Sequence, residues 1–266
     1  MKQRMIDLMN SDKTTTDYEG AVMADFGLDP QKHYDVLVVA PGWKPDKIMK
    51  DQDVKITCTA VHSYKSGYEV QGDGFLIAWI QIGAGANRVI DELCLCAVLD
   101  FDKIVFVGAV GALVPELPVG TVCTPSRSIA GNLAGGYLME DITKYKPFEA
   151  VYPNDPEFVE SVISLAHGMG HEGVKAAVFC TDSVYCEYSH MDFIKSFGVS
   201  LIEMETSVLY QMADLLEKPA IALLAVSDNN TTGDPLLLRT AEQRDAYDQG
   251  RKKVIPDIII GIAKML

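Results

Sequence analysis

The sequence lacks any apolar run long enough to cross a lipid bilayer. Its longest apolar runs, such as Ala220 to Val226, are far shorter than the roughly 20 residues that a membrane-spanning helix requires. Lys2 and Arg4 lie at the N-terminus, but no apolar segment follows them, so the pattern of a signal peptide is missing. We therefore expect a cytoplasmic protein that does not contact a membrane.

Positive charge is scarce. The chain has 23 lysines and arginines against 37 aspartates and glutamates, which gives a formal net charge of −14. Such an excess of negative charge disfavours a surface for nucleic acid or for an anionic membrane. It also means that any anionic ligand needs a local cationic site.

Motifs for metals and cofactors are missing as well. The six cysteines include no C-x-x-C pair, the spacing typical of zinc and redox sites. The glycine-rich segment Gly83 to Asn87 lacks the third glycine of a dinucleotide-binding fingerprint. We expect buried free thiols in a reducing compartment, no metal site and no cofactor.

Short apolar runs rich in β-branched residues alternate with helical patterns along most of the chain. Such runs are typical of buried strands, and we expect strands at 35–40, 54–61, 67–71, 75–82, 103–107, 174–179 and 220–226. The alternation predicts one α/β domain, a three-layer sandwich with a mixed central sheet flanked by helices. Residues 1–33 are more polar, and we expect them to form a helical appendage to a catalytic domain at 34–266.

Three acidic residues are prominent between Val199 and Asn230. Glu203 and Glu205 lie directly before a helical pattern, and Asp228 directly follows the apolar run Ala220 to Val226. A carboxylate just past the carboxyl end of a buried strand lies where open α/β sheets place their chemistry. Taken singly, each of these residues is equally well explained as a cap of a helix or a turn.

The segment Glu203-Met204-Glu205, followed after one helix and one strand by Ser227-Asp228, resembles the signature of the nucleoside phosphorylase and nucleosidase superfamily. Its members include hexameric purine nucleoside phosphorylase, uridine phosphorylase and the methylthioadenosine nucleosidases. The resemblance extends from roughly Val36 to the C-terminus and implies the phosphorylase/hydrolase-like fold. It also implies that Glu205, with Glu203 and Met204, binds the ribose, and that Asp228 protonates the departing base.

A second catalytic residue follows from the same resemblance. The segment from Thr240 to Arg244 resembles a part of the hexameric purine enzymes in which an arginine helps the aspartate to donate its proton. Arg244 is therefore expected to assist Asp228. The alternative is a surface arginine on an amphipathic helix.

The base site is expected at two other segments. Gly108 to Leu113 matches the superfamily's Gly-x-x-Gly landmark, where glycine lets the backbone approach the substrate closely. The superfamily places a phenylalanine that stacks on the base where this chain has Val184, with Tyr185 next to it. The residues expected to bind the base are Val110, Gly111, Val184 and Tyr185.

The phosphate site departs from the pattern of the phosphorylases. Those enzymes usually place an arginine and a serine or threonine at the positions of Phe106 and Ala109. The loop after the first strand retains a glycine and one cation, although a plain Pro-Gly turn with a solvated lysine explains that loop equally well. The residues expected to bind phosphate are Gly42, Lys44, Gly108 and Ala109.

The resemblance implies cleavage of the N-glycosidic bond of a nucleoside, and a purine nucleoside is preferred. We expect phosphorolysis, with phosphate as co-substrate and a pentose 1-phosphate as product. Hydrolysis is the first alternative, because the usual phosphate ligands are absent, and a nucleoside-binding protein without turnover is the second. The resemblance to a superfamily of oligomeric enzymes, together with the apolar start of the N-terminal segment, implies a homo-oligomer, either a dimer or a hexamer.

Overall fold

The computed structural model describes residues 1–265. One ten-stranded sheet forms the centre of the molecule, in the order β10-β6-β8-β9-β5-β1-β4-β3-β2, with β7 paired to β6. The strands of the first half are β1 (His33–Pro41), β2 (Lys55–Val61), β3 (Ser66–Gly72), β4 (Phe75–Ile82) and β5 (Asp100–Ala112). Those of the second half are β6 (Val122–Ala130), β7 (Ala150–Val151), β8 (Val174–Cys180), β9 (Leu201–Glu203) and β10 (Ala220–Asn229).

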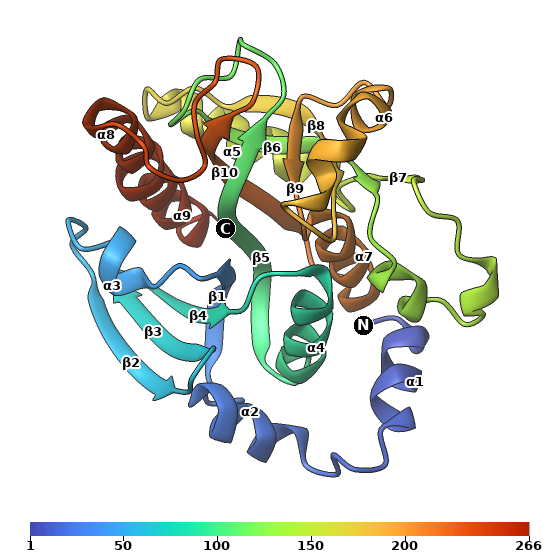
Figure 1. Cartoon of the computed structure of the whole chain (residues 1–266). Helices are drawn as coiled ribbons and strands as arrows, with labels where there is room; N and C mark the ends of the chain where they lie inside the picture. Colours follow the sequence, from blue (N-terminus) through green and yellow to red (C-terminus); the bar gives the residue numbers. More distant parts are fainter. Residues whose placement is uncertain (266) are drawn as a thin grey trace.

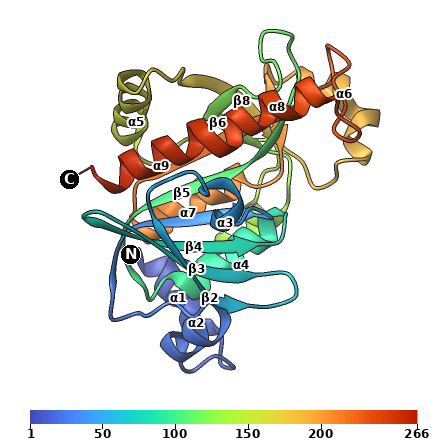
Figure 2. The same cartoon turned by 90° about the vertical axis from the view of Figure 1, so that its left-hand side faces the viewer.

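Helices cover both faces of this sheet (Figures 1 and 2). One face carries α1 (Gln3–Ser11), α2 (Tyr18–Phe26), α4 (Ala86–Cys96) and α7 (Thr206–Leu216). The other carries α3 (Pro45–Ile48), α5 (Pro156–Gly168), α8 (Ala241–Gln249) and α9 (Ile255–Ala263), and α6 (Met191–Lys195) packs in a smaller apolar cluster with residues of β8 and β9. The mixed α/β sandwich expected from the alternating pattern is confirmed.

The first strand shows why both faces must be covered. Leu37 and Val39 of β1 belong to the hydrophobic core under α4 and α7, whereas Val36, Val38 and Ala40 belong to the core under α9. Side chains alternate between the faces of a strand, so a continuous apolar run is stable only where helices bury both faces.

Strand pairing adds a feature that the alternating pattern does not predict. Besides its antiparallel contact with β6, β10 pairs in parallel with β5 from Ala220 to Asn229. This contact closes β5, β10, β6, β8 and β9 into a ring, while β1, β4, β3 and β2 extend the sheet on the other side of β5. The carboxyl ends of β1, β5 and β10 therefore meet at one edge.

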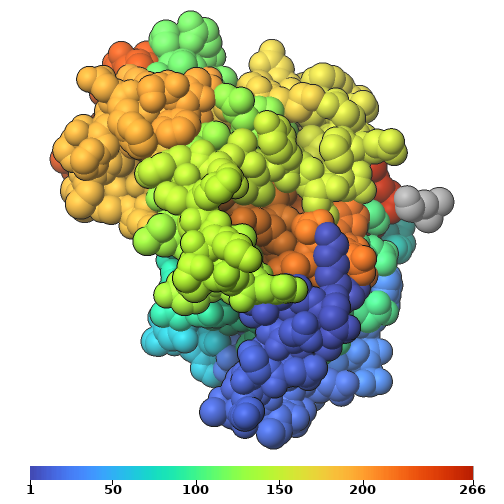
Figure 3. Space-filling view, turned by 90° about the vertical axis from the view of Figure 1, so that its right-hand side faces the viewer, coloured from blue at the N-terminus to red at the C-terminus, as the bar shows by residue number. Residues whose placement is uncertain are grey.

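The N-terminal segment is integrated into the body. Met5 of α1 is fully buried, and Val22 and Phe26 of α2 are as well. The guanidinium of Arg4 donates to the carbonyl oxygens of Leu138 and Met139, at 2.9 and 2.6 Å. Figure 3 shows this segment lying against the surface of α7 and of the loop around residues 130–150. Within the described residues, no helix combines the length and the apolar character that crossing a membrane demands.

Candidate active site

A cavity of about 210 Å³ opens at the edge where the carboxyl ends of β1, β5 and β10 meet. Most residues that the sequence assigns to sugar and base line it. These are Val110, Gly111, Val184, Glu203, Met204, Glu205 and Asp228, together with Gly108 and Ala109. Parallel sheets expose backbone groups and loop side chains at this end of their strands, so the location suits a ligand site.

Glu205 is the most constrained carboxyl group of the cavity. It is buried, and its Oε1 accepts a hydrogen bond of 2.6 Å from the backbone N–H of Gly85. Gly85 has a φ of +113°, a conformation that favours glycine and that turns this N–H toward the cavity loop. Burial, and next the negative charge of Glu203, raise the pKa of Glu205 to about 8.

Glu203 has a structural role that the sequence interpretation did not give it. Its carboxylate accepts the backbone N–H groups of Glu205 and Thr206, at 2.7 and 3.0 Å, and the Thr206 hydroxyl at 2.8 Å. The thiol of Cys180 donates to it as well. Glu203 thus satisfies the free N–H groups at the start of α7, and its oxygens are already engaged instead of being free for ribose.

Asp228 lies at an irregularity in β10. The register between β10 and β5 shifts between Val226 and Asp228, and such bulges redirect side chains. The Ser227 hydroxyl donates to Asp228 Oδ1 at 2.5 Å, and a β-carbon on Gly111 would lie 3.2 Å from Oδ2. Burial raises the pKa of Asp228, whereas the Ser227 hydrogen bond and the charge of Arg239 oppose the rise.

Arg239, not Arg244, is the cation that acts on Asp228. Its Nε donates to the carbonyl oxygen of Ser227 at 2.6 Å, and its guanidinium lies 4.7 Å from the centre of the Tyr247 ring. Arg244 is exposed, and its Nη1 donates to the carbonyl oxygen of Arg239. The Thr240–Gln243 capping box starts α8 at Ala241 and leaves Arg244 within that helix, away from the cavity.

The residues expected to bind phosphate are divided between two places. Gly108 and Ala109 line the cavity, but Gly42 and Lys44 line a separate basic depression of about 480 Å³. Trp43 contributes to the walls of both. Phe106 is buried in the hydrophobic core, and no lysine, arginine or histidine is among the described residues that line the cavity.

The stacking position also differs from the expectation. Tyr185 is 81% exposed and is not part of the cavity wall, whereas Val184 and Tyr188 are. One further wall residue, Glu187, was not assigned from the sequence at all. It is buried, and burial together with the nearby charge of Asp228 raises its pKa to about 7.

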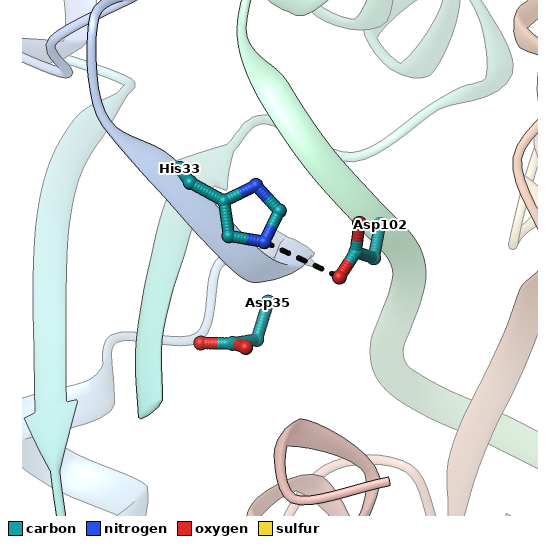
Figure 4. A group of neighbouring side chains, drawn as sticks. All are labelled: His33, Asp35 and Asp102. Atoms are coloured by element: carbon teal, nitrogen blue, oxygen red, sulfur yellow. Dashed lines mark ion pairs between the residues drawn. The ribbon is translucent and has the colours of Figure 1, made fainter. Parts of the chain in front are cut away.

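A separate cluster of titratable side chains lies at the amino end of β1 (Figure 4). His33 contacts Asp100 through Nδ1 at 3.0 Å and Asp102 through Nε2 at 3.3 Å. His33, Asp35 and Asp102 each offer a ligand atom within 4.8 Å of the others. The hydrogen bond that the His33 ring makes to Asp100 raises the pKa of His33, which favours the protonated ring as an ion-pair partner of the two aspartates.

Comparison with known proteins agrees with this geometry. Residues 60–255 match the family model of the phosphorylase superfamily, and the chain belongs to that family. It is similar to the DeoD-type purine nucleoside phosphorylase of Bacillus velezensis, with 40% identity over 178 residues, 66% of this chain and 68% of that protein. The enzyme of the same name from Bacillus subtilis is 32% identical over 175 residues, with the same coverage. That of Oceanobacillus iheyensis is 25% identical over 193 residues, 72% of this chain and 75% of that protein.

The buried carboxyl groups predict how stability depends on pH. The folded state holds protons on Glu205 and Glu187 that the unfolded chain releases at lower pH, so the free energy of unfolding falls as pH rises from about 5 to about 8. One unit of pKa shift corresponds to about 1.4 kcal/mol. Between pH 5.5 and pH 8.5, we therefore expect the free energy of unfolding to fall less in Glu205→Gln than in the wild type, by at least ~2 kcal/mol. Urea unfolding at the two pH values measures this.

Glu116→Gln, at an exposed position outside the cavity, is the matched control and should keep the wild-type pH dependence. A pH dependence of Glu205→Gln parallel to that of the wild type would show that Glu205 is ionised throughout and would contradict the assignment.

Proposed function

We propose that this protein cleaves purine nucleosides by phosphorolysis and releases the free base and a pentose 1-phosphate. The observation that carries the proposal is the shared cavity of Glu205 and Asp228, one carboxyl group suited to a sugar and one to a leaving base. The similarity to three DeoD-type purine nucleoside phosphorylases supports the reaction type and the choice of purine.

Glu205 is proposed to bind the ribose. Burial favours the protonated form of Glu205. Vicinal hydroxyl groups donate hydrogen bonds to an ionised carboxylate, so binding of a ribose favours loss of the Glu205 proton. The Gly85 N–H holds one carboxylate oxygen in place beforehand. As the glycosidic bond breaks, positive charge develops on the sugar, and the fixed negative charge of Glu205 stabilises it. Met204 supplies an apolar wall beside it.

Asp228 is proposed to be the general acid. Burial raises the pKa of Asp228 and thereby favours its protonated form, and the proton passes to N7 of the purine while the electrons of the glycosidic bond move onto the base. Arg239 limits the rise of this pKa and stabilises the aspartate that remains. It thereby takes the position that the sequence interpretation gave to Arg244.

Phosphate is proposed as co-substrate, held by backbone groups near Gly108 and Ala109. Lys44 attracts it from the adjoining depression, across Trp43. The described wall residues include four carboxylates, Glu187, Glu203, Glu205 and Asp228. No side-chain cation among the described wall residues offsets the charge of a dianion, and we expect weak binding and a high KM for phosphate.

We also propose a cytoplasmic homo-oligomer. All six cysteines are free, which suits a reducing compartment. The segment 131–152 exposes large apolar side chains, among them Leu133, Tyr137 and Tyr152, each at least 60% exposed, and such clusters are typical of subunit contacts.

The dependence on phosphate tests the reaction type. We expect base release from adenosine or inosine to be at least about tenfold slower without phosphate, because water must then replace the nucleophile, and to yield a pentose 1-phosphate when phosphate is present. Chromatography of both products measures this. Equal rates in phosphate-free buffer, with free ribose as product, would show a hydrolase.

Asp228→Asn tests the general acid. An asparagine cannot supply the proton, so we expect kcat to fall about a hundredfold or more while KM changes little. Asp182→Asn, an exposed carboxylate just beyond β8, is the matched control and should retain wild-type kcat. Near-normal kcat for Asp228→Asn would remove this residue from the mechanism.

A further inference from the structure

Glu187 is a cavity residue that the mechanism above does not use. It lies in a short 3₁₀ turn, Cys186–His190, separated from the end of β8 by five residues, and only 8% of it is exposed. Its Oε2 is enclosed and has no hydrogen-bond partner among the described residues. Burial of a carboxyl oxygen without a partner costs several kcal/mol, so native proteins rarely retain one without a use.

The surroundings of Glu187 place it on the side of the cavity where the base is proposed to bind. Val184 and Tyr188, its neighbours in sequence, line the same wall. Asp228 on β10 is the charged group that acts on Glu187, and Arg239 acts on Asp228. The titratable residues of Glu187's own segment are Cys186, Tyr188 and His190, and His190 and Asp182 line a second cavity together with Glu187. The other wall carboxylates already have partners, since Glu203 binds the start of α7 and Glu205 binds Gly85.

Purine chemistry links this position to one part of the base. N7 and the substituent at C6 lie on the same edge of a purine, where adenine presents an N–H donor and a 6-oxopurine presents an acceptor. A base whose N7 faces Asp228 therefore presents its C6 substituent beside Asp228. Resting on the function proposed above, we propose that Glu187 reads the C6 substituent and selects 6-aminopurine nucleosides over 6-oxopurine nucleosides.

The selection depends on the charge of Glu187. An ionised carboxylate accepts a hydrogen bond from the 6-amino group and repels a 6-oxo group, whereas a protonated carboxyl group can donate to the 6-oxo group. Because the pKa of Glu187 is raised to about 7, the ionised fraction changes about tenfold between pH 6 and pH 8. The preference for the 6-amino substrate should therefore increase with pH.

The test is the ratio of kcat/KM for adenosine to that for inosine, measured at pH 6 and pH 8 with excess phosphate. We expect this ratio to increase at least about tenfold in the wild-type protein, and up to about a hundredfold if inosine binds only the protonated form of Glu187. In Glu187→Gln it should stay constant, because the amide carries a donor and an acceptor at every pH. Protonation of Asp228 affects both substrates alike and cancels in the ratio.

Glu116→Gln is again the matched control, and its ratio should increase as in the wild type. A thermal melt at pH 8 shows whether Glu187→Gln folds, and we expect its Tm to equal or exceed that of the wild type because an unpartnered buried charge is removed. A ratio that is constant with pH in the wild type, or that increases equally in Glu187→Gln, would overturn the proposal.

Failure of the proposed function gives a different result. If neither nucleoside releases its base under any condition, the reaction assignment is wrong. The same comparison is then made with the dissociation constants of adenosine and inosine at the two pH values, by calorimetry. A ratio of these constants that depends on pH in the wild type and not in Glu187→Gln supports the role of Glu187, and any other pattern overturns it.

Discussion

The rest of the site depends on the interaction between the Glu203 carboxylate and the backbone N–H groups at the start of α7. A helix N-terminus presents unpaired N–H groups and a partial positive charge, and Glu203 binds two of these groups with its buried carboxylate. Thr206 strengthens the contact through its own hydroxyl, which also bonds Ser128 of β6 at 2.7 Å. This arrangement holds the turn between β9 and α7 in one conformation. Glu205 lies in that turn, so its carboxyl group reaches the cavity at a defined place.

The same burial that positions the carboxyl groups sets their charge. Four of them line one cavity whose described wall residues include no lysine, arginine or histidine, and repulsion together with poor hydration makes full ionisation unfavourable. Burial therefore raises the pKa values of Glu205, Glu187 and Asp228 and favours their protonated forms. A nucleoside brings hydroxyl and N–H donors that suit such groups, whereas phosphate brings further negative charge. The acidic wall thus favours the nucleoside and makes phosphate the weakly held substrate.

Much of the fold could be predicted from the sequence because burial on two faces leaves a clear pattern. The continuous apolar runs at 35–40, 103–107 and 220–226 became the adjacent central strands β1, β5 and β10. Glu205 and Asp228 come together because Gly111 of β5 pairs with Ile202 at the end of β9 and with Asp228 of β10. The closed ring of strands was not predictable, since a strand's pattern shows what it buries and not which neighbour it pairs with.

The expected and the observed positions of the site residues differ in loops and at a helix start. Arg239 has no signal in the sequence as a partner of Asp228, because the path of the chain between Asn230 and Thr240 is set by tertiary contacts, although the Thr240–Gln243 capping box marks the start of α8. The sequence suggests Tyr185 as the stacking residue only because it follows Val184, the position of the superfamily's phenylalanine. The segment after β8 leaves Tyr185 exposed to solvent instead. Glu187 carried no signal, because a lone glutamate in a polar segment is indistinguishable from a surface residue until its burial is known.

The most direct test of the account is a crystal structure of the protein with a purine C-nucleoside, whose carbon–carbon glycosidic bond cannot be cleaved. The account predicts that both ribose hydroxyls lie within hydrogen-bond distance of the Glu205 carboxylate, with N7 of the base at Asp228. A ligand bound with its sugar away from Glu205, or outside the cavity between β1, β5 and β10, would contradict it.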